Sequence, residues 1–72
     1  MPWVRSEAVR RISWDRQTST LFVQFVDGDT YAYLGVPEAV YADFLAADSK
    51  GAFFASAIRN RYPHRKLARS AA

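Results

Sequence analysis

Residues 21–34 contain the pattern that most narrowly limits how this chain can fold. Alternating apolar and aromatic residues flank the dipeptide Asp27-Gly28 on both sides. Asp-Gly between two such runs is typical of a two-residue hairpin turn, because both central residues of a type I′ turn need a positive φ. The pattern therefore predicts two antiparallel strands, over residues 20–26 and 30–35, joined by a tight turn.

A two-residue turn also predicts which side chains share a face of the hairpin. It places Val26 opposite Asp29 and, further along, Phe22 opposite Tyr33. Side chains alternate across a strand, so the apolar face consists of Leu21, Val23, Phe25, Ala32 and Leu34. The aromatic face consists of Phe22, Gln24, Tyr31 and Tyr33. The apolar face predicts a core, whereas the aromatic face is either a second packing layer or a platform on which bases stack.

The flanking sequence completes an α+β domain. A strand over residues 9–14 and a turn at 15–18 precede the hairpin, which makes an antiparallel three-stranded meander. After Gly35 the apolar spacing becomes helical. This predicts a helix from about 37 to 47 and a second one that Ser49 caps and Pro63 ends. We expect two C-terminal helices packed on one face of the meander. Residues 1–8 are an N-terminal segment, 9–63 the single domain and 64–72 a basic, mobile tail.

Composition excludes several kinds of protein. The 72 residues include no cysteine, so no disulfide or thiolate metal site supports the fold. The single histidine, His64, follows Pro63 without an evident partner, and no nucleophile motif is present. We therefore expect no catalytic residue, no metal and no cofactor. No apolar run is long enough to span a membrane and no signal-peptide stretch opens the chain, so we expect a cytoplasmic protein without membrane contacts.

Charge is distributed unevenly along the chain. The net charge of +3 divides into −3 for residues 1–48 and +6 for residues 49–72. A basic C-terminal third indicates a polyanionic partner. It is explained equally well as a solvated basic end, because basic residues near a helix C-terminus complement the helix dipole.

Three groups of residues are candidates for contacting nucleic acid: an aromatic set that stacks on bases, a helix start that receives phosphate and a basic set that neutralises the backbone. The aromatic set is Phe22, Gln24, Tyr31 and Tyr33. The helix start is Ser49, Lys50 and Gly51, and the basic set is Arg59, Arg61 and Arg65. Each set also has a purely structural explanation, namely cross-strand packing, an ordinary helix cap and a solvated helix end.

Several short motifs in this chain resemble the KTSC domain over about residues 5–67. They are Ile12-Ser13-Trp14-Asp15, Asp27-Gly28, Tyr31-Ala32-Tyr33, Val36-Pro37, Ser49-Lys50-Gly51 and Phe53-Phe54. That family is named for the C-terminus of some lysyl-tRNA synthetases and also occurs as free-standing small bacterial proteins. The resemblance implies the fold, and RNA binding has been suggested for the family. Trp14 stands where Tyr is expected, and Ala55 where Asn is common.

The sequence leaves two functions open. The favoured one is a non-catalytic accessory module that binds single-stranded RNA, tRNA or another nucleic acid. The alternative is a protein–protein interaction module that uses the aromatic face or a free edge strand. In either case we expect a monomer or a weak homodimer.

Overall fold

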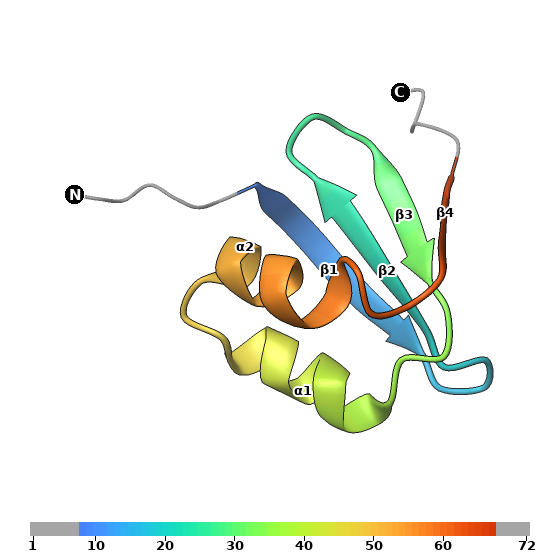
Figure 1. Cartoon of the computed structure of the whole chain (residues 1–72). Coiled ribbons are helices and arrows are strands. Elements are labelled where there is room, and N and C mark those ends of the chain that lie inside the picture. The colour runs from blue at the N-terminus through green and yellow to red at the C-terminus, as the bar shows by residue number, and fades with distance from the viewer. Residues whose placement is uncertain (1–7, 68–72) are drawn as a thin grey trace.

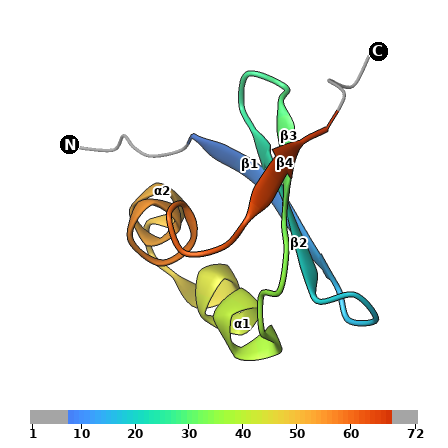
Figure 2. The same cartoon turned by 45° about the vertical axis from the view of Figure 1, so that its right-hand side comes forward.

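The computed structural model describes residues 8–67, and its centre is an antiparallel sheet with the strand order β1-β2-β3-β4. The strands are β1 (Val9–Asp15), β2 (Thr20–Phe25), β3 (Thr30–Tyr33) and β4 (His64–Lys66). Between β3 and β4 lie α1 (Glu38–Ala46), α2 (Lys50–Phe53) and η1 (Phe54–Ile58), a π-helical continuation of α2. Figures 1 and 2 show the helices together on one face of the sheet, and no other helix or strand of the described chain covers the opposite face.

The α+β class is confirmed, and two details of the expected architecture are wrong. The sheet has a fourth strand, β4, inside the segment expected to be a tail. The helices precede this strand rather than ending the chain. Backbone hydrogen bonds hold the returning chain beside β3: Leu34 N–H donates to the Pro63 carbonyl and Leu67 N–H donates to that of Thr30. Of the expected N-terminal segment and tail, residues 1–7 and 68–72 lie outside the described residues.

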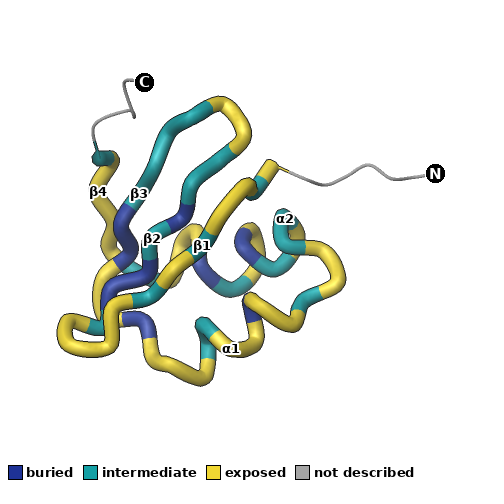
Figure 3. The backbone as a smooth tube through the Cα atoms, turned by 180° about the vertical axis from the view of Figure 1, so that it is seen from behind, coloured by how far each residue is buried: buried dark blue, intermediate teal, exposed yellow. Residues whose placement is uncertain are grey.

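The core lies between the helices and one face of the sheet. Its fully buried side chains are Leu21, Val23, Val36, Phe44 and Ile58, and Figure 3 shows the buried positions along β2, β3 and the helices. Burying each large apolar side chain is worth roughly 1.5–3 kcal/mol. The sheet and the helices therefore stabilise each other, and neither layer has a sufficient core of its own.

Trp14 joins the first strand to the first helix. Its indole N–H donates to the Val36 carbonyl at 2.8 Å, and its ring stacks on Tyr41 with a centroid separation of 5.8 Å. The bulky residue at this position of the motif thus bridges two elements that are distant in sequence.

The β2–β3 hairpin has a register one residue away from the predicted one. Leu21 pairs with Tyr33, and Val23 pairs with Tyr31. The loop holds three residues rather than two: Phe25 N–H donates to the Asp29 carbonyl at 2.9 Å, and Gly28 N–H donates to the Phe25 carbonyl at 2.9 Å. Gly28 has a φ of +99°. A type I turn followed by a left-handed glycine is the usual three-residue hairpin connection.

This shift changes which residues share a face, because a one-residue slip moves every side chain of a strand to the other side. Tyr31 and Tyr33 lie on the helix-covered face with the core residues of β2, and Ala32 lies on the uncovered face. The predicted platform of Phe22, Gln24, Tyr31 and Tyr33 is therefore wrong as a single surface. Leu34, expected in the core, is 41% exposed.

The second helix begins as the sequence predicts and then widens. The Ser49 hydroxyl accepts a hydrogen bond from Ala52 N–H at 3.1 Å, which confirms the cap. Further along, Arg59 N–H donates to the Phe54 carbonyl at 2.9 Å, the i→i+5 bond of a π-turn. Phe54 and Ile58, the ends of this wider turn, are both buried in the core.

Candidate nucleic-acid interface

The uncovered face of the sheet presents polar and basic side chains around one aromatic ring. Strand pairing places Ser13 and Ala32 on either side of Phe22, and Arg11 opposite Gln24. We call this surface the open sheet face; it consists of Arg11, Ser13, Phe22, Gln24, Thr30, Ala32 and Arg65. A shallow hollow of about 220 Å³ lies among its β1, β2 and β3 residues.

Arginines lie on both outer strands of the open sheet face. Arg11 comes from β1, and Arg65 from β4, where it pairs with Ala32. Neither arginine makes an ion pair within residues 8–67. In that range a salt bridge joins Lys66 to Asp29. Asp15 lies on the same face, two residues from Ser13, and its carboxylate accepts the N–H of Gln17 at 2.9 Å. Two arginines against one carboxylate give this face a net positive charge, which suits a polyanion.

A cleft of about 450 Å³ lies on the other side of the sheet, between the helix-covered face and the α2–η1 segment. Rings form its walls. Phe54 packs edge to face against Phe25 and Tyr33, with centroids 5.2 Å and 5.5 Å away. Tyr33 lies 5.3 Å from the His64 ring, and Tyr31 lies 6.4 Å from Tyr33. We call this space the aromatic cleft.

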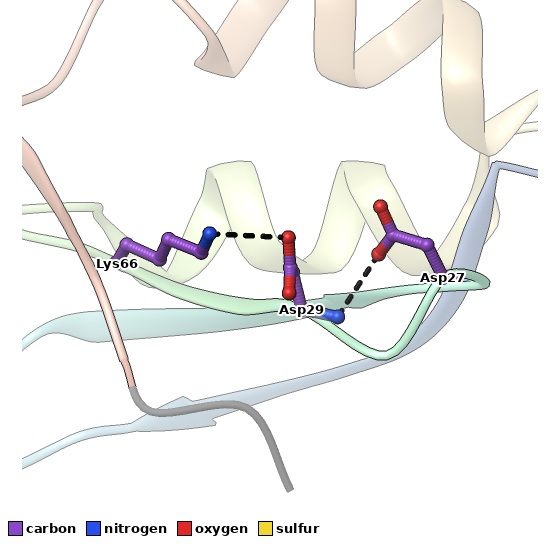
Figure 4. A network of polar contacts seen from close by, with 3 residues as sticks. All are labelled: Asp27, Asp29 and Lys66. Carbon is purple, nitrogen blue, oxygen red and sulfur yellow. Dashed lines mark hydrogen bonds and ion pairs between the residues drawn. The ribbon is translucent and has the colours of Figure 1, made fainter.

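Charged groups surround the aromatic cleft. Asp27 and Asp29 lie on the β2–β3 turn, and Arg59 lies on the helical wall. Figure 4 shows how the turn is ordered: Asp29 N–H donates to Asp27 Oδ1 at 2.9 Å, and Lys66 Nζ lies 3.4 Å from Asp29 Oδ2. The Arg59 guanidinium carbon lies 5.8 Å from the centroid of the Phe54 ring.

Comparison with known proteins gives the family of this chain. Residues 5–62 match the KTSC domain. The chain belongs to the KTSC domain family. It is 36% identical over 59 residues to a protein from Tsukamurella paurometabola, over 82% of this chain and 88% of that protein. The crystal structure of a KTSC domain protein from Yersinia pestis has a TM-score of 0.84 and 38% identity, over 90% of this chain and 92% of that one.

A lysine–tRNA ligase from Nostoc punctiforme also contains a matching region. It is 32% identical over 59 residues, which are 82% of this chain and 10% of the ligase. A KTSC domain therefore stands nearly alone in one relative and is a small part of a tRNA ligase in another. This arrangement is consistent with an accessory module, and neither the family nor the Yersinia pestis structure indicates a catalytic function.

The KTSC fold separates the predicted contact residues. Phe22, Gln24 and Arg65 meet on the open sheet face, whereas Tyr31, Tyr33, Gly51 and Arg59 line the aromatic cleft. Ser49, Lys50 and Arg61 belong to neither set. At the helix start the Lys50 ammonium donates to the Ala47 carbonyl at 2.7 Å, so both it and the Ser49 hydroxyl have partners within the chain. A phosphate site there stays a prediction.

Sequence reasoning missed Arg11. Its strand has a bulge between Val9 and Arg11, so Arg10 is the extra residue and the alternation is broken. Val9 therefore packs against the core while Arg11 lies on the open sheet face, although strict alternation would put both on one face. Metal ligands are a separate question: in the described part of the chain, no group of three or more His, Cys, Asp or Glu residues is placed to hold a metal ion. No described helix is long and apolar enough to cross a membrane.

Tyr33 makes the stability of the protein depend on pH in the alkaline range. Burial raises the pKa of its phenol, the nearby Tyr31 adds to this effect, and Arg59 opposes it. Above the ordinary phenol pKa of about 10 the unfolded chain loses this proton before the folded one does. The contribution of the protonated Tyr33 phenol to the free energy of unfolding is therefore intact below about pH 10. It is lost as the pH rises further. Urea unfolding at several alkaline pH values should show a shallower fall in stability for Tyr33→Phe than for the unsubstituted protein; equal slopes would contradict this.

Proposed function

We propose that this KTSC domain is a non-catalytic accessory module that binds single-stranded nucleic acid, with RNA or tRNA as the favoured partner, through the open sheet face. The observation that carries the proposal is the position of Phe22, a ring on an uncovered sheet face that also holds Arg11 and Arg65. The ring can stack on an unpaired base while the arginines neutralise the flanking phosphates. A cytoplasmic location belongs to the same proposal.

The polar residues around Phe22 support a single-stranded partner. Ser13, Gln24 and Thr30 supply short donors and acceptors that can reach the edges of splayed bases or ribose hydroxyls. With one ring on this face among residues 8–67, stacking is limited to about one base at a time. Binding should therefore be modest, tolerant of sequence and dependent on salt. The matching region of a lysine–tRNA ligase favours RNA over DNA as the class to test first.

Replacing Phe22 by leucine tests this proposal. The change keeps an apolar side chain beside Ala32 but removes the ring, and stacking on one base is worth about 1–3 kcal/mol. We expect the affinity for a short single-stranded RNA to fall about fivefold or more, measured by fluorescence anisotropy. Phe53→Leu makes the same change on the helical side and should leave the affinity unaltered. Unchanged binding by a folded Phe22→Leu variant would remove the stacking role.

The outer edge of β1 favours a second candidate function, protein–protein interaction. This strand has seven residues, and in the described chain it pairs with β2 alone. Its outer backbone groups could add a strand from a partner or from a second copy of this chain. Salt separates the two functions, because phosphate contacts weaken steeply with salt whereas strand addition largely survives it.

A further inference from the structure

The aromatic cleft contains a tyrosine hydroxyl for which the described chain supplies no hydrogen-bond partner. Tyr33 is only 4% exposed, yet its hydroxyl makes no hydrogen bond to any residue in the range 8–67. A buried tyrosine hydroxyl usually has a partner, because leaving it unsatisfied costs free energy. Tyr33 also lines a cleft that is open to solvent. Its partner can therefore come from solvent or from a bound molecule.

We propose that the aromatic cleft binds one nucleotide, with the base against its rings and the phosphate at Arg59. The site is separate from the open sheet face and does not depend on nucleic-acid binding there. The occupant can be a free nucleotide or the terminal nucleotide of a strand, since the two share this chemistry.

The walls of the cleft suit a planar ring. Its volume of about 450 Å³ lies within the usual range for small-molecule sites, roughly 300–1,000 Å³. Tyr31 and Tyr33 line the sheet wall and Phe54 lines the helical wall, where its ring packs edge to face against that of Tyr33. Every nucleobase has a π-face, so such walls favour a base over an aliphatic ligand of the same size.

Arg59 is the side chain that binds the phosphate group of the nucleotide. It is exposed, its guanidinium lies above the Phe54 ring, and it has no carboxylate partner within the described chain. A guanidinium offers several fixed N–H donors that match phosphate oxygens. The neighbouring Asn60 also lines the cleft, and its amide can add a donor on the same side.

The acidic turn orients the ligand. The carboxylates of Asp27 and Asp29 repel phosphate, so they exclude it from the sheet-turn side of the cleft. Lys66 offsets the charge of Asp29, whereas Asp27 lies on the exposed turn and makes no salt bridge within residues 8–67. A carboxylate in this position accepts hydrogen bonds from amino and imino N–H groups of a base. Guanine, which carries both, is therefore the base to test first.

A ¹⁵N–¹H NMR titration of the full chain with GMP and with guanosine tests this inference. We expect shifts at Tyr31, Tyr33, Gly51 and Arg59, and affinity for GMP about fivefold or more above that for guanosine, because only GMP carries the phosphate. Arg59→Gln should bring GMP down to the affinity of guanosine. Tyr33→Phe should weaken both ligands about fivefold. The matched change Arg61→Gln should alter neither.

Three results would overturn the inference: no shifts with millimolar GMP, shifts outside the cleft, or an equal loss of GMP and guanosine binding in Arg59→Gln. The variant Phe22→Leu keeps this test apart from the proposed function, since it should weaken RNA and leave GMP unaffected. If the protein binds GMP but not RNA, only the open-face proposal is removed. If it binds RNA but not GMP, only the nucleotide site in the aromatic cleft is removed. If a short RNA shifts the cleft residues at lower concentration than GMP, the occupant is the end of a strand.

Discussion

Replacing Arg11 and Arg65 together by glutamine should lower the affinity for a short single-stranded RNA at least tenfold at low salt. Both arginines lie on the open sheet face without an ion pair in the described chain, so their charge is available to phosphates. Each phosphate contact adds about 0.7 to the slope of log K against log salt for single strands. Losing two contacts should therefore flatten that slope by about 1.4, measured by fluorescence anisotropy over a salt series.

A second double variant separates a located interface from diffuse attraction. Arg16→Gln with Arg61→Gln removes the same charge from the β1–β2 turn and from the segment after η1, and both side chains are exposed. We expect this control to bind RNA nearly as well as the unsubstituted protein, with a similar salt slope. If the two double variants lose affinity equally, the net charge rather than the open sheet face causes binding.

Truncating Phe44 should have the largest effect on stability. Phe44 is the one buried side chain of α1 and is 0% exposed. Its ring stacks on Phe53 with a centroid distance of 5.3 Å, which joins α1 to α2. A Phe→Ala change in a core costs about 3–5 kcal/mol. A small domain has a total stability of only about 0.05–0.15 kcal/mol per residue, so Phe44→Ala should lose a large part of the free energy of unfolding.

Urea unfolding followed by circular dichroism measures this cost. Leu45→Ala is the matched control, because the neighbouring Leu45 is 50% exposed and an exposed substitution usually changes stability by less than about 0.5 kcal/mol. A cost below about 1 kcal/mol for Phe44→Ala would show that α1 is not anchored through this ring.

Local sequence signals predicted the elements of this domain well. Period-two alternation marks β2 and β3, helical spacing marks α1, and the Ser49 hydroxyl caps the next helix as expected. These features depend on neighbours within a few residues, which a single sequence displays directly.

Local sequence signals alone could not predict the register of the hairpin. An Asp-Gly pair fits a two-residue turn and also a three-residue loop in which glycine takes the left-handed position. The two choices differ by one residue and bury opposite faces of β3. The fold turns Tyr31 and Tyr33 toward the helices, with Tyr33 4% exposed, and leaves Leu34 41% exposed. This choice removes more apolar surface from water, and it follows from the whole core rather than from the turn.

The candidate sites were predicted only in part for the same reason. The sequence predicts Phe22, Gln24 and Arg65 as contacts, and the fold does bring them onto one face. Arg65 reaches that face only because β4 pairs with β3. That short strand has three exposed residues and therefore no apolar alternation that a sequence could display. The aromatic cleft depends on the corrected register and on the return of the chain after η1.

The most direct test of the open sheet face is a ¹⁵N–¹H NMR titration of the full chain with a short single-stranded RNA at low salt. We predict that the largest shifts fall on Arg11, Phe22, Gln24 and Arg65, and that high salt reverses them. Shifts confined to η1 and the segment that follows it, with the open sheet face unchanged, would contradict the proposed interface.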